Sequence, residues 1–239
     1  VHLKKIDEVV PVIMISGHAN VQMAIDSLKL GAFEFMQKPF SSERLINFVN
    51  RAIENLELKT ENKILENKLF HSYDIIGKSN SIQKINNLIT KLSSTESRVF
   101  ISGPTGSGKE LVARQIHKQS SRKSKPFIVV NGALLDPEKY EYELFGIDKG
   151  DGIINYGFFE KAKDGTLLID EICEIPLETQ AKILRVLIEQ KFRRVNGLKE
   201  VIANVRIIST SSKNIREEID KGNFREDLYH RLNVVPINL

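Results

Sequence analysis

Hydrophobic positions divide the chain into a short first block and a longer second block. In the first block, residues 9–15 form a continuous apolar run, and apolar residues then recur at helical spacing over residues 21–28. A continuous apolar run is typical of a strand buried on both faces of a parallel sheet. Asn20 and Gly31 are residue types that begin and end helices. A second strand is predicted over residues 32–36.

A charged stretch connects the two blocks. A helix is predicted to begin near Ser41 and to run on as a helical linker over residues 44–72. Apolar residues recur there at roughly heptad spacing, at Leu45, Val49, Ala52 and Leu56. Residues 57–68 are then mostly Glu, Lys and Asn. This spacing leaves open both a coiled-coil seam and a solvated helical spacer.

The second block, residues 73–239, alternates predicted helices with predicted strands. Helices are predicted at residues 82–92, 110–119 and 177–189 and near residues 215 and 227, and strands at 98–101, 127–130, 166–169 and 205–208. Strands that alternate with helices indicate an α/β fold with a parallel sheet.

Composition narrows the class of protein without indicating a function. The length of 239 residues fits one large domain or two smaller ones, and 41% hydrophobic with 28% charged side chains is typical of a folded protein. The net charge of +4 leaves nucleic-acid binding open. Cys173 is the single cysteine, which excludes an internal disulfide and a Cys-based zinc site. Because no apolar run approaches the ~18–20 residues that span a bilayer, we expect a cytoplasmic protein without membrane contact.

A glycine-rich loop lies between the predicted strand at 98–101 and the following helix. The loop reads Gly103, Pro104, Thr105, Gly106, Ser107, Gly108 and Lys109. In this context the pattern predicts phosphate binding, because glycines let backbone N–H groups surround an anion at a helix N-terminus and the lysine reaches the outer phosphates. Glu110 stands where such loops usually carry Ser or Thr. Mg²⁺ must then be held by phosphates, water and a distant acid.

That acid is predicted at the end of the strand over residues 166–169. Asp170 and Glu171 follow it directly. Asp170 is expected to hold Mg²⁺, directly or through water, and Glu171 to orient the attacking water. The alternative is an acidic N-cap for the next helix.

The second block resembles the AAA+ ATPase domain of NtrC-type bacterial enhancer-binding response regulators. The matching stretches are GPTGSGKELVARQIH from Gly103, ELFG from Glu143, DGTLLIDEI from Asp164, VRII from Val205 and FREDLYHRLNVV from Phe224. The resemblance implies a three-layer α/β/α P-loop core that binds ATP, and Glu110 is the residue that this family usually carries after the lysine.

The resemblance also implies roles for residues outside the loop. Asn131 would bond Glu171 and switch it between resting and active positions. Ser212 stands where the family has a polar sensor residue, often Asn or His. The segment containing Ile76 and Gly77 would cover the adenine.

Two arginines are implied to act on a neighbouring subunit. Arg225 and Arg231 would reach that subunit's ATP as arginine fingers, which makes hydrolysis depend on a homo-oligomer, either a dimer or a ring. The spacing alone favours another interpretation, in which both side chains form surface ion pairs with Glu226 and Asp227.

The first block, residues 1–58, resembles the C-terminal half of a (βα)5 receiver domain. The order Ser-Gly-His, helix, Gly-Ala-Phe, Lys-Pro-Phe carries the resemblance. It implies that Ser16 bonds a phosphoryl-aspartate, that Lys38 pairs with it and that Phe35 is the switch aromatic. The phospho-accepting Asp would lie upstream of Val1, and a cognate histidine kinase would be the partner.

One loop departs from sigma-54 activators. After Gly146 the chain reads IDKGDGIINYG, which is shorter than the family's loop and lacks its GAFTGA motif. In lacking this loop the chain resembles NtrX-like regulators, and the resemblance implies that it does not contact sigma-54 through such a loop. We therefore predict a transcription regulator in which ATP controls oligomerisation and DNA-bound regulation. A sigma-54 activator ATPase, a general AAA+ remodelling enzyme and an inactive remnant are the alternatives.

The ends of the chain lead us to expect a fragment. It begins at Val1 rather than Met, and it stops at Leu239 before the family's helical lid and DNA-binding helix-turn-helix. DNA contact is thus expected through a missing C-terminal domain. The basic residues within 118–125 are expected to form a solvated loop, and Arg193 and Arg194 an exposed part of a strand.

Overall fold

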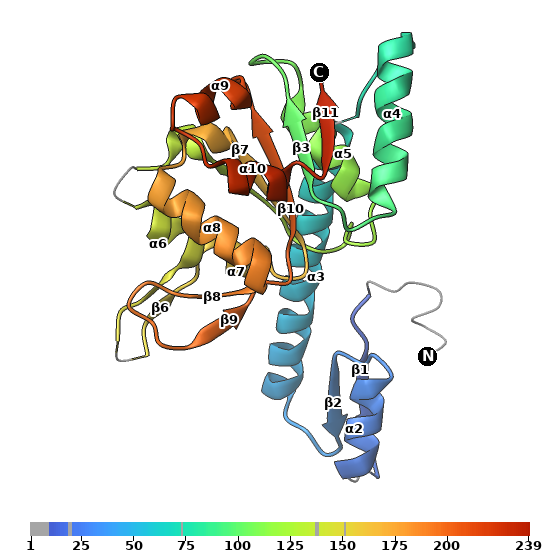
Figure 1. Cartoon of the computed structure of the whole chain (residues 1–239). Helices are drawn as coiled ribbons and strands as arrows, with labels where there is room; N and C mark the ends of the chain where they lie inside the picture. Colours follow the sequence, from blue (N-terminus) through green and yellow to red (C-terminus); the bar gives the residue numbers. More distant parts are fainter. Residues whose placement is uncertain (1–9, 19–20, 73, 137–138, 151) are drawn as a thin grey trace. The chain divides into compact units, whose positions relative to one another are not determined.

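The computed structural model describes residues 10–18, 21–72, 74–136, 139–150 and 152–239 (Figure 1). The chain divides into two compact units, unit 1 from Val1 to Ser72 and unit 2 from Tyr73 to Leu239. Among the described residues, no helix has both the length and the apolar composition to cross a membrane.

The described part of unit 1 contains two parallel strands and two helices. Its elements are β1 (Ile13–Ser16), α2 (Val21–Lys29), β2 (Glu34–Gln37) and α3 (Ser42–Ser72). Gly31, with φ of +92°, follows α2 in a left-handed conformation that favours glycine. The charged stretch lies in the long helix α3, and its role as a linker, as a coiled coil or a spacer, stays a prediction. Val9 and Asn20 lie outside the described residues.

The first strand is not buried on both faces, although its apolar run is typical of such a strand. Met14 and Ile15 of β1 are 45% and 42% exposed. The reason is that β1 pairs with β2 alone among the described residues, so the described sheet of unit 1 is two strands wide. Met36 and Ala52 are the buried hydrophobic residues of the described part of this unit.

The centre of unit 2 is a five-stranded parallel sheet. Its strands are β3 (Val99–Ser102), β4 (Phe127–Asn131), β7 (Thr166–Asp170), β10 (Arg206–Ser211) and β11 (Val235–Asn238). Their order is β11-β3-β10-β7-β4, and all pairs are parallel. The middle strand β10 is buried along its whole length. The carboxyl ends of β3, β10 and β7 therefore lie side by side.

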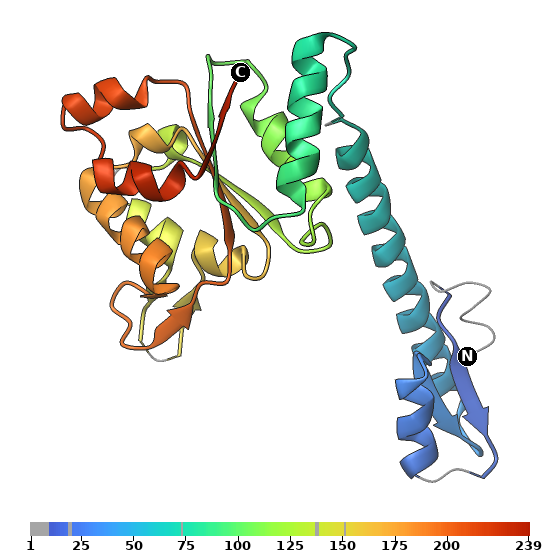
Figure 2. The same cartoon turned by 45° about the vertical axis from the view of Figure 1, so that its right-hand side comes forward.

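Helices cover both faces of this sheet and complete the predicted three-layer α/β/α core. One face carries α4 (Asn80–Ser93) and α5 (Lys109–Lys118), which Figure 2 shows side by side. The other face carries α6 (Tyr140–Phe145), α7 (Phe158–Lys161), α8 (Leu177–Glu189), α9 (Ile215–Asp220) and α10 (Glu226–Leu232).

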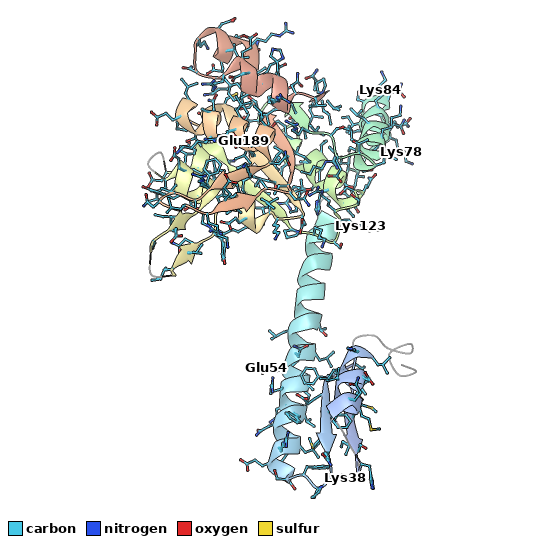
Figure 3. All side chains as sticks on the ribbon, turned by 60° about the horizontal axis from the view of Figure 1, so that its bottom comes forward. Lys38, Glu54, Lys78, Lys84, Lys123 and Glu189 are labelled. Carbon is cyan, nitrogen blue, oxygen red and sulfur yellow. The ribbon has the colours of Figure 1, made fainter. Side chains whose placement is uncertain are left out.

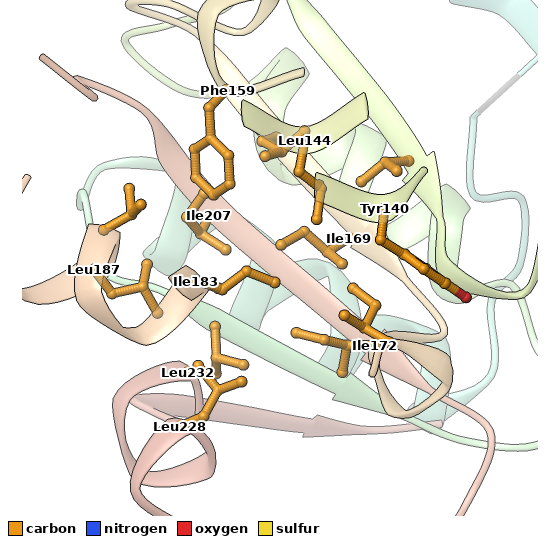
Figure 4. Close-up of a cluster of buried hydrophobic side chains, with 14 of the residues drawn as sticks. Tyr140, Leu144, Phe159, Ile169, Ile172, Ile183, Leu187, Ile207, Leu228 and Leu232 are labelled. Carbon is orange, nitrogen blue, oxygen red and sulfur yellow. The ribbon is translucent and has the colours of Figure 1, made fainter. Parts of the chain in front are cut away.

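Side chains that alternate along each strand pack into two hydrophobic cores, one on each face of the sheet. On β7, Leu167 and Ile169 pack toward α8 and α10, and Leu168 packs toward α4 and α5. Figure 4 shows Ile169 and Ile207 of the sheet among Ile183 of α8 and other buried side chains. Full burial of one such side chain stabilises the fold by about 1.5–3 kcal/mol.

Two short antiparallel hairpins were not predicted. They pair β5 (Ile147–Asp148) with β6 (Ile154–Asn155) and β8 (Lys191–Arg193) with β9 (Glu200–Ile202). Arg193 lies in β8 as expected, but Arg194 is not a solvated strand residue. Its side chain is 10% exposed and is paired with Glu160 of α7 at 2.5 Å.

Charged side chains otherwise lie mostly at the surface of unit 2. Figure 3 shows Lys78, Lys84, Lys123 and Glu189 there, and all four are exposed. Within the basic segment 118–125, however, Arg122 is only 16% exposed because it pairs with Glu96 at 2.8 Å. The expectation of a solvated loop therefore fails for Arg122.

Candidate functional site

The glycine-rich loop joins β3 to α5 and needs glycine at several positions. Gly106 and Gly108 have φ of +80° and +89°, a region that other residues rarely adopt. A Cβ added at Gly103 would lie 2.9 Å from the Ser107 Oγ. Side chains at these positions would distort the loop or fill the space that an anion needs.

Lys109 is the buried cation of this loop. It is 6% exposed, and its Nζ donates to the carbonyl oxygens of Gly103 at 3.0 Å and Pro104 at 3.2 Å. Its third partner is Glu171 Oε1, at 3.3 Å. A buried charge requires such partners. The Ser107 Oγ is also buried, and it has no hydrogen-bond partner in the described residues. Both groups suit an anionic ligand.

Glu110 takes no part in this cluster. Its carboxylate pairs along α5 with Arg114, at 2.6 Å. The position that carries a hydroxyl in many phosphate loops is therefore used for an ion pair within the helix.

Asp170 is held by the strands on either side of β7. Asn131 Nδ2 donates to Asp170 Oδ2 at 2.8 Å, and the Thr210 hydroxyl donates to Asp170 Oδ1. The prediction that Asn131 bonds Glu171 was wrong for this structure. The reason is the register of the sheet, in which Asn131 of β4 lies directly opposite Asp170.

Glu171 follows β7 in a left-handed conformation with φ of +50°. Its N–H donates to the Thr210 hydroxyl at 3.1 Å. Its Oε2 accepts from the Ser212 N–H and the Ser212 hydroxyl, each at 2.8 Å. Ser212 is thus a direct neighbour of Glu171.

The surroundings of Glu171 keep it ionised. Burial acts to raise the pKa of Glu171, but the hydrogen bonds from Ser212 and the charge of Lys109 outweigh burial and hold this pKa below its usual value. Thr210 touches both acids and was missed by the sequence analysis. The sequence signal for Thr210 is only its hydroxyl near the end of an apolar run, because the place of β10 beside β7 is known from the sheet order alone.

The segment expected at the adenine precedes α4. Ile76 is 93% exposed, and a Cβ at Gly77 would lie 3.0 Å from Ile82 of α4. Contact between this segment and a nucleotide stays a prediction.

The two arginines expected to act as fingers lie on the surface around α10. Arg225 pairs with Asp227 through Nη2–Oδ2 and Nε–Oδ1 distances of 2.7 and 3.0 Å. For Arg225 the structure therefore contains the ion pair of the alternative interpretation. The Arg231 side chain is exposed and has no ion pair in the described part of the chain. Action on a neighbouring subunit stays a prediction for both.

In unit 1 two of the expected switch residues, Ser16 and Lys38, lie together at the carboxyl ends of β1 and β2. The Lys38 N–H donates to the Ser16 carbonyl at 2.8 Å, and the Ser16 hydroxyl donates to the His18 carbonyl at 2.7 Å. Phe35 is half-buried on β2. The structure brings Ser16 and Lys38 together, and their response to phosphorylation stays a prediction.

Comparisons with known proteins agree with this division. Residues 75–238 match the family described as the sigma-54 interaction domain, and residues 1–50 match the response regulator receiver domain. The nitrogen assimilation regulatory protein NtrX of Azorhizobium caulinodans is 47% identical over 231 residues, which cover 96% of this chain and 51% of that protein. The DNA-binding transcriptional regulator NtrC of Escherichia coli K12 is 37% identical over 241 residues, covering 99% and 51%. The chain thus spans about half the length of the curated relatives it matches.

Solved structures give the same result. NtrX from Brucella abortus is similar with a TM-score of 0.81 and 45% identity, over 99% of this chain and 53% of that one. A crystal structure of the same protein in complex with ATP has a TM-score of 0.73 and 44% identity, over 99% and 54%. The chain therefore belongs to the NtrX- and NtrC-like family of two-component response regulators, which combine a receiver domain with a sigma-54 interaction domain of the P-loop AAA+ ATPase class.

Proposed function

We propose that unit 2 binds ATP in the loop between β3 and α5 and hydrolyses it. The observation that carries the proposal is the position of Lys109, a buried amine whose partners are two loop carbonyls and Glu171. A triphosphate can replace these partners, and the buried Ser107 hydroxyl offers it a further donor. The relative from Brucella abortus that was solved with ATP supports the assignment of the nucleotide.

Mg²⁺ fits the same edge of the sheet. Asp170 offers carboxylate oxygens, and Mg²⁺ commonly takes one or two carboxylates together with phosphates and water. In the part of the chain that the structure describes, no three His, Cys, Asp or Glu side chains gather as metal ligands. Asp170 would hold the ion with the nucleotide, and the ion would offset charge on the phosphates.

The side chains around the nucleotide then have separate tasks. Lys109 binds the outer phosphates, and Glu171 orients the attacking water. Arg225 and Arg231 of a neighbouring subunit offset the charge that develops on the γ-phosphate. The ion pair of Arg225 with Asp227 is exposed, and exposed ion pairs contribute little to stability, so Arg225 can exchange Asp227 for a phosphate.

Nucleotide binding is tested by calorimetry on Lys109→Ala. Loss of the buried amine should weaken ATP binding by about 100-fold or more, because it removes the charged donor to the phosphates. The matched control is Lys123→Ala, which removes an exposed lysine of the same unit. Unchanged ATP affinity in Lys109→Ala would reject the proposal.

We further propose that ATP controls the oligomeric state of the regulator. The receiver domain would be phosphorylated by a cognate histidine kinase, and DNA would be bound by a part of the protein outside this chain. Hydrolysis per subunit should rise with protein concentration and collapse in Arg225→Ala. A rate that is independent of concentration and unchanged in Arg225→Ala would contradict the role in the neighbouring subunit.

The alternative is a sigma-54 activator, and the family match over residues 75–238 favours it. The chain between Gly146 and Gly157 argues against it. Among its described residues this segment forms the two-residue strands β5 and β6, and its sequence is shorter than the loop that carries GAFTGA. Open-complex formation by sigma-54 polymerase with the full-length protein would favour the alternative, and its failure would favour regulation by ATP-dependent assembly.

A further inference from the structure

The helix α10 carries one of the two candidate arginines at each of its ends. Arg225 is the N-cap residue of α10, and Arg231 lies in its last turn. Both arginine side chains are exposed. Leu228 and Leu232 of the same helix are fully buried in the cluster that contains Ile183 of α8 (Figure 4). The apolar side of α10 therefore fixes the helix on the core, while its two arginines remain accessible to another molecule.

The backbone at the N-terminal end of α10 is held by a buried glutamine of α8. Gln180 is 0% exposed, and its Oε1 accepts from the Arg225 N–H at 2.9 Å. Its Nε2 donates to the Asn223 carbonyl at 3.0 Å and to the Ile175 carbonyl at 2.7 Å. A buried amide needs such partners. Gln180 thus ties the backbone of Arg225 to the segment that follows β7.

The backbone at the C-terminal end of α10 is held by an arginine that directly precedes β3. Arg98 Nη1 donates to the Arg231 carbonyl at 3.0 Å, and the Arg98 carbonyl accepts from the Val235 N–H at 3.2 Å. A cation at the C-terminus of a helix is favoured by the helix dipole. Burial lowers the pKa of Arg98, and the charge of Arg231 acts in the same direction. The two guanidinium groups therefore repel each other, which favours an Arg231 side chain directed away from Arg98.

Gln180 and Arg98 belong to elements that frame the nucleotide site of their own subunit. β3, which follows Arg98, leads directly into the phosphate loop at residues 103–109, and α8 follows the acids at the end of β7. An edge-to-face contact between Phe100 of β3 and Tyr229 of α10, with ring centroids 5.8 Å apart, adds a third link. The elements on both sides of the nucleotide site thus hold α10.

We propose that Gln180 and Arg98 are positioning residues, which hold the two ends of α10 so that its arginines reach the ATP of a neighbouring subunit. The inference rests on the proposed ATPase function and on the role given there to the two arginines. The hydrogen bonds of both positioning residues go to backbone atoms of their own subunit. Their effect should therefore appear in the subunit that supplies the arginines, and not in the subunit whose ATP is hydrolysed.

Mixed assemblies of two variants of the full chain separate these two subunits. The supplying chain carries Glu171→Gln, which keeps both arginines but removes the group that orients water at its own site. The accepting chain carries Arg225→Ala together with Arg231→Ala, and its own nucleotide site is intact. Each variant alone should be inactive. ATP hydrolysis by the mixture then comes from accepting chains that face the arginines of supplying chains, and phosphate release measures its rate.

Arg98→Ala should act in one of these chains and not in the other. Placed in the supplying chain, it should lower the mixed rate about tenfold, because misplacing a positioned group by about 1 Å can cost about 100-fold in rate. Placed in the accepting chain, it should leave the mixed rate and the Kd of fluorescent mant-ATP within about twofold. Arg98→Lys keeps a donor for the carbonyl and should lose less than Arg98→Ala. Equal losses from both placements would overturn the proposal, because they would indicate a purely structural role.

The contact of Gln180 is tested by the same mixture and by one amide proton. Gln180→Met keeps most of the side-chain volume, removes the hydrogen bonds, and should lower the mixed rate only in the supplying chain. The Arg225 N–H donates to Gln180. Hydrogen exchange at Arg225 should therefore become about tenfold faster in Gln180→Met and stay unchanged in Arg98→Ala. Unchanged exchange at Arg225 in Gln180→Met would overturn the role of Gln180.

The remaining outcomes separate this inference from the proposed function. A wild-type chain that does not bind or hydrolyse ATP contradicts the proposed function, and with it the inference that rests on it. A mixture that stays inactive although the wild-type chain hydrolyses ATP contradicts the role of the arginines in the neighbouring subunit. A mixture whose rate is the same with and without Arg98→Ala in the supplying chain contradicts only the positioning role of Arg98.

Discussion

Units 1 and 2 are both built from parallel strands and helices, but their strands are covered differently. In unit 2, helices pack on both faces of five strands, and β10 is buried along its whole length. In unit 1, two strands carry the exposed side chains of Met14 and Ile15. The comparison teaches that an apolar run predicts a strand, whereas its burial depends on the number of neighbouring strands and layers.

The candidate sites of the two units also differ in the number of strands that surround them. The acids of unit 2 are fixed by three adjacent strands, so each carboxylate has donors from a neighbouring strand or the residue that follows it. Ser16 and Lys38 of unit 1 lie at the edge of a two-stranded sheet and share one backbone hydrogen bond. The described side-chain hydrogen bonds therefore hold the acids of unit 2 from several strands, whereas Ser16 and Lys38 share a backbone contact.

The largest expected change in stability comes from truncating a buried leucine, and an exposed leucine serves as its control. Leu168→Ala of β7, at 0% exposure, should destabilise unit 2 by about 3–4 kcal/mol, since it leaves a cavity between packed layers. Leu30→Ala of unit 1, at 60% exposure, should change stability by less than about 1 kcal/mol.

Spectroscopy can follow the two units separately. The chain has no Trp, and its five Tyr all lie between residue 73 and the C-terminus, so tyrosine fluorescence in urea reports unit 2. Circular dichroism reports both units. Equal losses of stability in Leu168→Ala and Leu30→Ala would contradict the claim that the two side chains differ in burial.

The second-largest expected loss of stability concerns the largely buried ion pair of Arg194 with Glu160. Arg194→Ala should destabilise unit 2 by about 3 kcal/mol, because it leaves Glu160, 10% exposed, without its partner. The control, Asp227→Ala, breaks the exposed pair with Arg225 and should have a much smaller effect on stability. Urea unfolding of both variants checks the order, and a larger loss in the control would contradict it.

A buried histidine makes unit 2 sensitive to mild acid. Burial lowers the pKa of His117 to about 4, and the nearby charges of Arg206, Arg114 and Arg122 act in the same direction against a backbone hydrogen bond with Lys125 that raises it. The unfolded chain binds the proton first, so stability is full above about pH 6.5 and falls as the pH drops toward 4.

This loss should reach roughly 2 kcal/mol at pH 5. His117→Gln cannot take up the proton and should lack this part of the pH dependence, even if it is less stable at pH 7. Urea midpoints of the two proteins at pH 7 and pH 5 provide the measurement. The same decrease in both proteins would assign the acid sensitivity to other groups.

The smallest effect concerns a turn of unit 1. Gly31→Ala forces a side chain into φ of +92° and should lower the stability of unit 1 by about 1 kcal/mol. The matched control is Gly17→Ala, where an added Cβ meets nothing within 4 Å. Circular dichroism should separate the variants, and a control that is more damaging than Gly31→Ala would contradict the backbone argument.

Local sequence predicted much of unit 2 because its elements carry strong local signals. The strands that become β3, β7 and β10 are short apolar runs, and the loop that ends at Lys109 has glycines where the backbone needs left-handed conformations. The two acids at the end of β7 were identified because they directly follow such an apolar run. β11 has a weaker signal, because Pro236 interrupts its apolar pattern, and it was missed.

The partners of the site residues could not be predicted, because they depend on strand order and register. Asn131 bonds Asp170 rather than Glu171 since β4 and β7 pair in that register. Thr210 was missed because nothing local indicates that β10 lies between β3 and β7. The burial of Arg194 likewise depends on Glu160, 34 residues away along the chain.

The most direct measurement is hydrogen exchange of the whole chain with and without ATP and Mg²⁺. We expect ATP to slow exchange at residues 103–109, at Glu171 and at Ser212, with no change in unit 1, and we expect Lys109→Ala to abolish the effect. An unchanged exchange pattern at the loop, or protection that survives in Lys109→Ala, would contradict a nucleotide site built from these elements of unit 2.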